Sequence, residues 1–210
     1  YNNYRSKRMN IIEATNTGNA WHQAYELVMK KGSSVKDGEI SLKEVLDVFL
    51  IVQSINGRDN ILEKYADKEM IKWMVEENFG GQKPVLDWGY SYGMRFRDFN
   101  GVDQISLIID KLKSNPESKS ATISLMNPSI DYRGHMPCIV ALDFKIRNDK
   151  LLITGFFRSQ DIGKKIYADI LALGKIQSEV ASALSTTTGE IKIFISSAHI
   201  YEQDFGKFQS

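Results

Sequence analysis

The sequence predicts an α+β fold in which a mixed β-sheet is covered by helices. One observation is that apolar residues recur at helical spacing in two long segments, one near each end of the chain. A second is that the latter half holds runs of alternating apolar and β-branched residues, which are typical of strands. Because strands and helices do not alternate regularly along the chain, we do not expect a parallel α/β fold.

In the first half, a helix is predicted over residues 17–31, where Trp21, Ala24, Tyr25 and Val28 share one face and Gly32 ends it. Residues 40–52 are strongly apolar and fit either a strand or a helix. We further expect a short helix over 66–78, an irregular segment rich in glycine and aromatic residues over 80–100, and a helix over 102–114.

In the second half, strands are expected over residues 120–126, 137–147 and 150–158, with a turn at Asn148-Asp149 joining the last two. A long helix is predicted over 162–184. Gly189 then precedes a final strand over 190–201, which is rich in β-branched residues.

The 210 residues are 42% hydrophobic, which is enough for one full core, and we expect a single domain over residues 9–210. The first eight residues, YNNYRSKR, precede Met9 and are interpreted as a vector remnant or a frayed end. The net charge of +1 provides no global field that would recruit nucleic acid or a membrane, so neither is expected as a partner.

No apolar run approaches the length of a membrane span, and the single cysteine excludes an internal disulfide and a multi-cysteine zinc site. We therefore predict no metal site. The triplet Asn127-Pro128-Ser129 is blocked as a glycosylation acceptor by its proline. These features favour a reducing, cytoplasmic location.

Asp169 is an anomaly on the predicted long helix. It follows Ile166 by three residues and precedes Leu173 by four, so it shares their apolar stripe. A carboxylate that faces a core is costly unless it is paired, hydrogen-bonded or protonated. Either Asp169 lies at the solvent edge of the stripe, or its carboxyl lines a pocket that this helix closes.

Other candidate residues are ambiguous when each is taken alone. His135 neighbours a Gly-Pro-containing loop and could lie near a site. Arg158-Ser159 ends a strand before a helix, where an arginine and backbone N–H groups could bind phosphate, although a buried structural arginine is an equal alternative. A lone cysteine in a strand, such as Cys138, is more often a small core residue than a nucleophile.

Taken in order, several motifs resemble the thymidylate synthase family. They are DWGYSYGMRFR (87–97), GVDQISLIIDKLKSNP, MNP, PC, FRSQD and AHIY. The resemblance covers residues 84–205 and is greatest to archaeal-type members, through FFRSQDI and SSAHIYEQDF. Cys138 precedes Arg158 by 20 residues, Arg158 precedes Asp169 by 11, and Asp169 precedes His199 by 30. The family keeps these intervals between its nucleophile, phosphate-binding arginine, base-reading residue and sugar-binding histidine.

The resemblance implies a role for each matched residue. Cys138 would attack C6 of a pyrimidine nucleoside monophosphate as a thiolate, and C5 would then take a methylene from 5,10-methylenetetrahydrofolate or a related methylene-pterin. Tyr92 would lie near the reacting ring. The remaining contacts would be Arg158, Ser159 and Gln160 to the substrate, the first two at its phosphate, His199 and Tyr201 to the sugar, and Asp161 to the pterin.

The resemblance also implies a homodimer in which each site borrows basic residues from the partner subunit. The borrowed pair is usually two arginines, whereas the matching positions here are Lys119 and Ser120. Lysine still neutralises phosphate, but without a bidentate fork. The family's tryptophan is replaced by Phe96, and GSSVKDGEIS holds no match for the arginine of its N-terminal phosphate loop. For the glutamate general acid, Glu44 and Asp47 are the candidates.

Asp169 occupies the base-reading position, which is asparagine in thymidylate synthases and aspartate in the cytidylate hydroxymethylases of the same family. A protonated carboxyl donates to cytosine N3 and accepts from its N4 amino group, and burial on an apolar helix face would raise its pKa toward that form. We therefore predict hydroxymethylation of CMP or dCMP. The alternatives are a thymidylate synthase that methylates dUMP and a degenerate homologue that binds nucleotides without turnover. A nucleic-acid binder is disfavoured.

Overall fold

The structure is a computed structural model that describes residues 9–55 and 58–208. The predicted N-terminal tail, residues 1–8, lies outside these ranges. The remaining chain forms one mixed sheet with helices on it, which confirms the predicted fold class.

Six strands form the sheet in the order β1-β3-β8-β6-β5-β4, and two short strands join its edge and its centre. The neighbours β1 and β3, and β6 and β8, run parallel, whereas β3 and β8, β5 and β6, and β4 and β5 are antiparallel. The bounds are β1 (Asn10–Ala14), β2 (Ser33–Asp37), β3 (Ile40–Val52), β4 (Thr122–Ser124), β5 (Ile139–Arg147), β6 (Lys150–Phe157), β7 (Gln160–Asp161) and β8 (Thr187–Tyr201).

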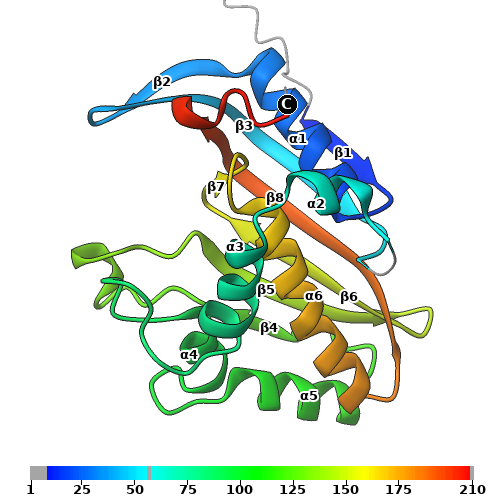
Figure 1. Cartoon of the computed structure of the whole chain (residues 1–210). Coiled ribbons are helices and arrows are strands. Elements are labelled where there is room, and N and C mark those ends of the chain that lie inside the picture. Colours follow the sequence, from blue (N-terminus) through cyan, green and yellow to red (C-terminus); the bar gives the residue numbers. More distant parts are fainter. Residues whose placement is uncertain (1–8, 56–57, 209–210) are drawn as a thin grey trace, which may run out of the picture.

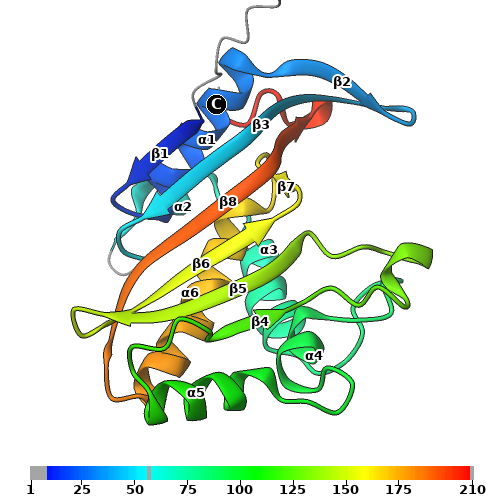
Figure 2. The same ribbon diagram turned by 180° about the vertical axis from the view of Figure 1, so that it is seen from behind.

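The helices cover one face of this sheet (Figure 1). The α6 helix crosses the middle of the sheet, α1 packs on β1 and β3, and α5 lies along the β4 edge. Seen from behind, the strands lie in front and none of the described helices covers them (Figure 2). The bounds are α1 (Thr17–Lys31), α2 (Asn60–Tyr65), α3 (Lys68–Lys72), α4 (Tyr92–Arg97), α5 (Gln104–Ser114) and α6 (Ile166–Ala183), with a π-helix at Trp73–Phe79.

Several predicted elements are confirmed because local chemistry determines them. The side chain of Asn16 accepts the Asn19 N–H and caps α1, which ends before Gly32 as expected. Residues 40–52 form a strand, which resolves the ambiguity of that segment. Asn148 and Asp149 have φ of 51° and 56°, the left-handed conformation that a two-residue hairpin turn between β5 and β6 requires.

Other predictions need correction. The helix expected over 66–78 is α3 continued by the π-helix, and α4 lies within the segment expected to be irregular. The α6 helix begins at Ile166, not near 162, because Gln160 and Asp161 first pair with β8 as β7. The final strand begins at Thr187, and the segment GSSVKDGEIS is the β2–β3 hairpin, which turns at Gly38. The strand β1 and the helix α2, which Asp59 caps, were not predicted.

The strands β3 and β8 change the face that they bury halfway along their length. Buried residues are spaced by two from Val48 to Val52 and from Ile191 to Ile195, but by three from Val45 to Val48 and from Ile195 to Ala198. Asp47, between the first two, has φ of 57°, a conformation that costs an L-residue roughly 1–2 kcal/mol. This switch turns Glu44 and His199, which pair across the two strands, into a cavity.

Candidate active site

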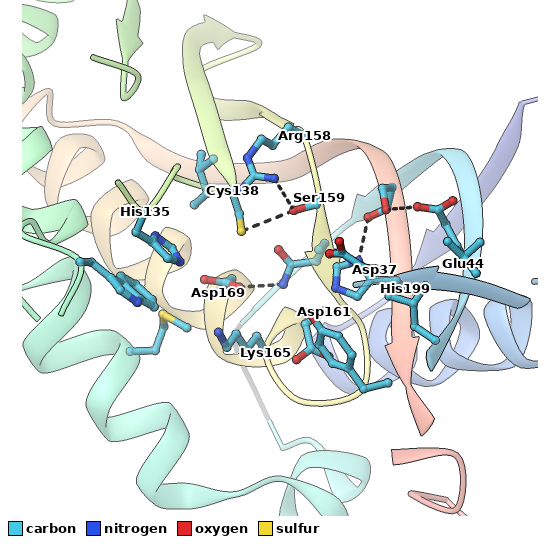
Figure 3. A pocket seen from close by; sticks show the side chains of 18 of the residues that line it. Asp37, Glu44, His135, Cys138, Arg158, Ser159, Asp161, Lys165, Asp169 and His199 are labelled. Atoms are coloured by element: carbon cyan, nitrogen blue, oxygen red, sulfur yellow. Dashed lines mark hydrogen bonds between the residues drawn. The ribbon is translucent and has the colours of Figure 1, made fainter. Parts of the chain in front are cut away.

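A cavity of about 510 Å³ lies where β7, the start of α6 and the start of β5 meet β3 and β8, and its volume is typical of a small-molecule site (Figure 3). It brings together all but one of the residues predicted for the site. These are Tyr92, Cys138, Arg158, Ser159, Gln160, Asp161, Asp169, His199 and Tyr201.

Cys138 directly precedes β5 and is half-buried. A register shift between Ile139 and Ala141 follows it, and such bulges often aim a side chain at a site. The Ser159 hydroxyl donates to the Cys138 sulfur at 3.6 Å. The cysteine is therefore accessible from the cavity and has a donor that stabilises a thiolate, in contrast to a buried core thiol.

Arg158 holds the segment that leads into Cys138. Its guanidinium donates to the carbonyls of Pro137 at 2.9 Å and Met136 at 2.7 Å, and to the Ser159 hydroxyl at 3.3 Å. A guanidinium has five N–H donors, so two stay available for an anion in the cavity. Arg158 therefore has the structural role that the sequence analysis allowed, and its two remaining N–H groups are of the kind that bind an anion.

A buried ion pair anchors the loop before Cys138. Arg95 contacts Asp131 at 2.5 Å, both side chains are almost fully buried, and Arg95 also donates to the carbonyl of Leu125. Since an unpaired buried charge is very costly, this bidentate pair fixes the path of the loop that carries His135 and Cys138.

Tyr92 presents a neutral phenol to the cavity. Its hydroxyl oxygen accepts the N–H of Ile139, next to Cys138, at 3.0 Å. Burial raises the pKa of Tyr92 well above its usual range, so the phenol keeps its proton. With one lone pair occupied, that proton is free to donate to a group in the cavity.

Asp169 lies in the first turn of α6 and is only 5% exposed, which excludes a position at the solvent edge. The amide of Gln160 donates to its Oδ2 at 2.7 Å. Burial raises the pKa of Asp169 to about 7, against the opposing effects of the Gln160 hydrogen bond and the Lys165 ammonium. Asp169 is therefore poised to exchange a proton near neutral pH.

The opposite wall of the cavity comes from β3, β7 and β8. Burial lowers the pKa of His199, against the nearby Asp161 carboxylate, so its imidazole is neutral and its ring lies 5.1 Å from that of Tyr201. Burial raises the pKa of Asp161, whose carboxylate accepts the N–H of Lys164. Glu44 accepts from the Ser197 hydroxyl at 2.5 Å and lines the cavity, whereas Asp47 is exposed and lies outside it.

Trp88 and Lys165 line the cavity but had no role in the sequence analysis, whereas His135, which was expected to lie near a site, does line it. The rings of Trp88 and His135 stack 4.3 Å apart at 6°, and the Lys165 ammonium lies over Trp88 at 5.6 Å. Lys165 makes no ion pair with another described residue. The sequence could have indicated Lys165 as a site residue, because it lies between Asp161 and Asp169, which were both predicted to belong to the site.

Comparisons with known proteins agree with this geometry. The family model described as thymidylate synthase matches residues 21–210. The chain belongs to the thymidylate synthase family. Relatives described as "Putative thymidylate synthase" from Methanosarcina mazei and Methanosarcina barkeri are 31% and 32% identical over 93% of this chain and 91% of their own. The thymidylate synthase of Mycoplasma genitalium is 33% identical over 57% of this chain and 42% of its own.

Members of this family are folate-dependent enzymes that transfer a one-carbon unit to a pyrimidine nucleotide, and the chain is accordingly a one-carbon transferase. The cavity contains a half-buried thiol, a guanidinium and a buried carboxyl, which are groups that a reaction of this kind can use. Within the described residues, no helix has the length and apolar character needed to cross a membrane.

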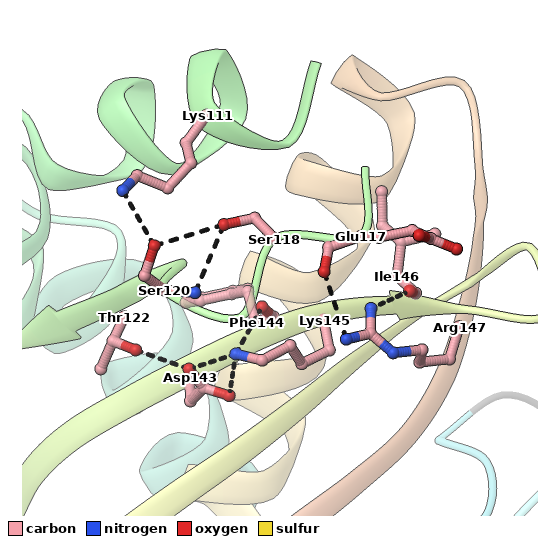
Figure 4. Close-up of polar contacts among 10 residues, drawn as sticks. All are labelled: Lys111, Glu117, Ser118, Ser120, Thr122, Asp143, Phe144, Lys145, Ile146 and Arg147. Atoms are coloured by element: carbon pink, nitrogen blue, oxygen red, sulfur yellow. Dashed lines mark hydrogen bonds and ion pairs between the residues drawn. The ribbon is translucent and has the colours of Figure 1, made fainter. Parts of the chain in front are cut away.

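Lys119 is the one predicted site residue that lies outside the cavity, in an exposed segment just before β4. Beside it, the Ser120 hydroxyl accepts from the ammonium of Lys111 at 3.2 Å and lies 3.4 Å from that of Ser118 (Figure 4). Lys111 on α5 therefore adds a second cation beside Ser120, the position where the family usually has an arginine. No residue of this segment, 117–120, lines the cavity.

Proposed function

We propose that this chain catalyses folate-dependent C5 hydroxymethylation of a cytidine monophosphate, CMP or dCMP, through attack of Cys138 on C6. The observation that carries the proposal is the buried carboxyl of Asp169, whose pKa burial raises to about 7. At neutral pH a large fraction of Asp169 is thus a neutral acid, which offers both a donor and an acceptor to a base.

That pair matches cytosine. The acid proton donates to N3, which is an acceptor in cytosine, while the other oxygen accepts from the N4 amino group. Uracil presents the opposite pattern, an N3–H donor beside an O4 acceptor. It therefore opposes a neutral acid whose proton points toward N3, and it leaves O4 unpaired beside an ionised carboxylate. A buried polar group without its partner costs about 1–3 kcal/mol, which favours cytidylate.

The residues around Cys138 support a covalent mechanism. The thiolate adds to C6, the C5–C6 π electrons move onto C5, and C5 becomes the nucleophile that takes the new carbon. Ser159 and Arg158 stabilise the thiolate before attack, and the remaining N–H groups of Arg158 bind the 5′-phosphate. A free thiol of this kind stays reduced in the cytoplasm, where we place the reaction.

The cavity also fits a methylene-pterin, 5,10-methylenetetrahydrofolate or a relative. The flat stack of Trp88 and His135 provides an aromatic wall, and the carboxyl of Asp161 provides an acceptor for the N–H edge of a pterin. When bound, the carrier supplies a carbon at the oxidation level of formaldehyde. Asp161, Trp88 and Lys165 are the residues that would hold it.

The product follows from how Cys138 leaves. Once C5 has lost its proton and bears the new carbon as an exocyclic methylene, water adds to that carbon. The methylene electrons restore the C5–C6 double bond, and the Cys138 sulfur departs from C6. The net gain is CH₂O, about 30 Da, compared with about 14 Da for a methyl product that needs a hydride.

The test is the base from which Cys138 releases the C5 hydrogen. Purified protein with formaldehyde and tetrahydrofolate is expected to release tritium from C5-labelled CMP or dCMP, and mass spectrometry is expected to find the hydroxymethyl product. Labelled dUMP serves as the comparison, with a ratio of kcat/KM of about 10²-fold in favour of cytidylate for one mismatched pair of contacts. Release from dUMP but from neither cytidylate contradicts the proposal.

Methylation of dUMP is the second candidate function. It is favoured by the similarity to the two Methanosarcina relatives, which are described as putative thymidylate synthases. Its product is distinguished from that of the proposed reaction by the mass difference above.

We also propose that the active protein is a homodimer formed through the face of the sheet that no described helix covers. Directly opposed residues make a row across it, hereafter the aromatic row, which consists of Phe49, Phe194 and Phe156 and is flanked by Ile11 and Ala141. Ile11 is 58% exposed and Phe156 is 42% exposed. Contiguous apolar surface of this kind, with polar contacts such as Asp143–Lys145 beside it, is typical of an interface.

Such a dimer gives Lys119 a function that it cannot have within its own subunit. Its exposed segment, with Lys111 beside Ser120, would supply positive charge to the phosphate bound by Arg158 of the other copy. Lys119 and Lys111 would then supply, as point charges, the positive charge that two arginines usually supply in this family.

Replacing Phe156 by glutamate is expected to weaken the dimer about 10²-fold or more, because twofold symmetry buries two unpaired charges at once. Sedimentation velocity measures the dissociation. The control is Leu107→Glu on α5, which introduces the same charge at a leucine that is 58% exposed and lies away from the aromatic row. This variant is expected to dimerise like the wild type. A wild-type protein that is monomeric at micromolar concentration, or a dimeric Phe156→Glu variant, contradicts this assignment.

A further inference from the structure

Gln160 and Asp169 form a polar pair in the wall of the cavity, and both residues belong to regular secondary structure. Gln160 is 2% exposed and lies in β7, which pairs with β8 opposite Ala198. Asp169 is held in the first turn of α6. The amide Nε2 of Gln160 donates to Oδ2 of Asp169 at 2.7 Å (Figure 3). Because both backbones are fixed and both side chains are buried, this contact has little freedom to rearrange.

The other carboxyl oxygen, Oδ1, receives no hydrogen bond from any residue that the structure describes. Asp169 nevertheless lines the cavity, so Oδ1 is the oxygen left for a ligand. A neutral carboxyl has one donor, and its carbonyl oxygen accepts an N–H bond much better than its hydroxyl oxygen does. The Gln160 contact therefore assigns the acid proton to Oδ1.

We propose that Gln160 is a positioning residue that fixes which oxygen of Asp169 carries the proton, and so makes Asp169 a donor toward N3 and an acceptor toward N4 of cytosine. This inference rests on the proposed function, and it identifies the residue that sets which oxygen of Asp169 donates to the base and which accepts from it. Without the hydrogen bond from Gln160, the proton of the neutral Asp169 carboxyl can occupy either oxygen. The half of the population with the proton on Oδ2 would face cytosine N3 with a second acceptor.

The two functional groups of the Gln160 amide explain why its polarity matters. A group at position 160 that accepted instead of donated would take the Asp169 proton for itself, and Oδ1 would then be an acceptor only. That arrangement suits the N3–H of uracil better than N3 of cytosine. The isosteric substitution Gln160→Glu produces this reversal, and Gln160→Met removes the contact at nearly constant length.

The charges around Asp169 come from several elements. Lys165, one turn earlier on α6, and the Gln160 hydrogen bond both lower the pKa of Asp169, whereas burial and the Asp161 carboxylate raise it. Loss of the Gln160 donor alone thus raises the pKa further, so the neutral acid persists to higher pH. The other ionisable groups that share the cavity are Lys36 and Asp37 on β2, Glu44 on β3, Tyr92 on α4, His135 and Cys138 before β5, Arg158 after β6, and His199 and Tyr201 on β8.

The test is the pH dependence of base preference, measured as the ratio of kcat/KM for cytidylate to that for dUMP. Titration of the Cys138 thiol and of the substrate phosphate affects kcat/KM for both substrates alike, so it cancels in this ratio. For the wild type it is expected to fall as pH rises through about 7. In Gln160→Met the midpoint is expected to move up by about 1 pH unit, since a hydrogen bond to a charged group is lost. In Gln160→Glu the ratio is expected to fall about 10²-fold.

The matched control is Gln177→Met. Gln177 is equally buried on α6, but its amide donates to the carbonyls of Leu151 and Gly189, remote from the cavity. This variant is expected to lower thermal stability and to keep the wild-type midpoint. The inference is overturned, and the proposed function is left standing, by either of two results. One is a pH midpoint of the ratio in Gln160→Met equal to that of the wild type. The other is a folded Gln160→Glu variant whose kcat/KM falls equally for cytidylate and dUMP. A wild type that uses neither CMP nor dCMP overturns the proposed function as well.

Discussion

Replacement of Cys138 by alanine is expected to lower product formation by about 10³-fold or more and to leave nucleotide binding largely intact. The sulfur is the atom that bonds to C6, and no other thiol exists in the chain. The Ser159 hydroxyl and the Arg158 guanidinium that surround it bind rather than react. Because Cys138 is half-buried, its loss is expected to change the free energy of unfolding by only about 1 kcal/mol.

The measurement combines the formaldehyde and tetrahydrofolate assay with calorimetric titration of CMP, dCMP and dUMP into wild type and Cys138→Ala. Ser159→Ala is the companion variant, since it removes the donor to the sulfur but keeps the nucleophile, and it is expected to retain measurable turnover. Nucleotide binding by the wild type without any product that depends on Cys138 contradicts the catalytic assignment. It supports instead the degenerate, nucleotide-binding homologue.

The parts of the fold that could be predicted are those in which neighbouring residues in the sequence settle the structure. The helix α1 has a cap, an apolar stripe and a terminating glycine, and the β5–β6 hairpin has its two left-handed residues at Asn148 and Asp149. The burial of Asp169 was likewise readable, because helical spacing placed it between Ile166 and Leu173 before any contact was known.

The parts that could not be predicted depend on pairings distant in sequence. The two residues of β7 become a strand only because β8 lies beside them, and this delays the start of α6. The switch of buried face near Asp47 needs β3 and β8 to change together, and neither strand shows it by its own alternation. The positions of Glu44 and His199 in the cavity follow from that switch.

The cavity residues show the same division. Cys138, Arg158, Asp169 and His199 could be identified through intervals that match the family, although the intervals do not reveal their hydrogen bonds. Lys165 and the stack of Trp88 on His135 belong to no such interval. The hydrogen bond from Gln160 to Asp169 joins the two-residue strand β7 to the helix α6. Only the folded structure shows which carboxyl oxygen accepts this hydrogen bond.

Replacement of Asp169 by asparagine is expected to reverse base preference from cytidylate to uridylate. When the Gln160 amide turns so that its oxygen accepts from the new carboxamide nitrogen, the carboxamide oxygen accepts from uracil N3–H and its nitrogen donates to O4. In that orientation it meets cytosine with two opposed contacts. Two contacts change from paired to opposed at about 1–3 kcal/mol each, so the ratio of kcat/KM is expected to shift by about 10²-fold or more.

The substitution also removes the only group at this position that titrates near neutrality. The wild-type pKa of Asp169 is raised to about 7 by burial, so the neutral form that reads cytosine prevails below that pH and is lost above it. Cytidylate preference should therefore decline in the wild type as pH rises. In Asp169→Asn the preference for uridylate should stay constant with pH, because an amide has no proton to lose.

Asp161→Asn is the matched control, since it makes the same chemical change in the same cavity. It is expected to lower the use of both bases alike, because Asp161 is assigned to the pterin. Their ratio is expected to stay pH-dependent, with its midpoint at lower pH, because the Asp161 carboxylate helps to raise the pKa of Asp169. If Asp169→Asn lowers both activities equally, or keeps a pH-dependent ratio, then Asp169 does not read the base. In that outcome its burial beside Gln160 is structural, and the specificity must come from other groups that line the cavity, such as Asn78 and Lys165.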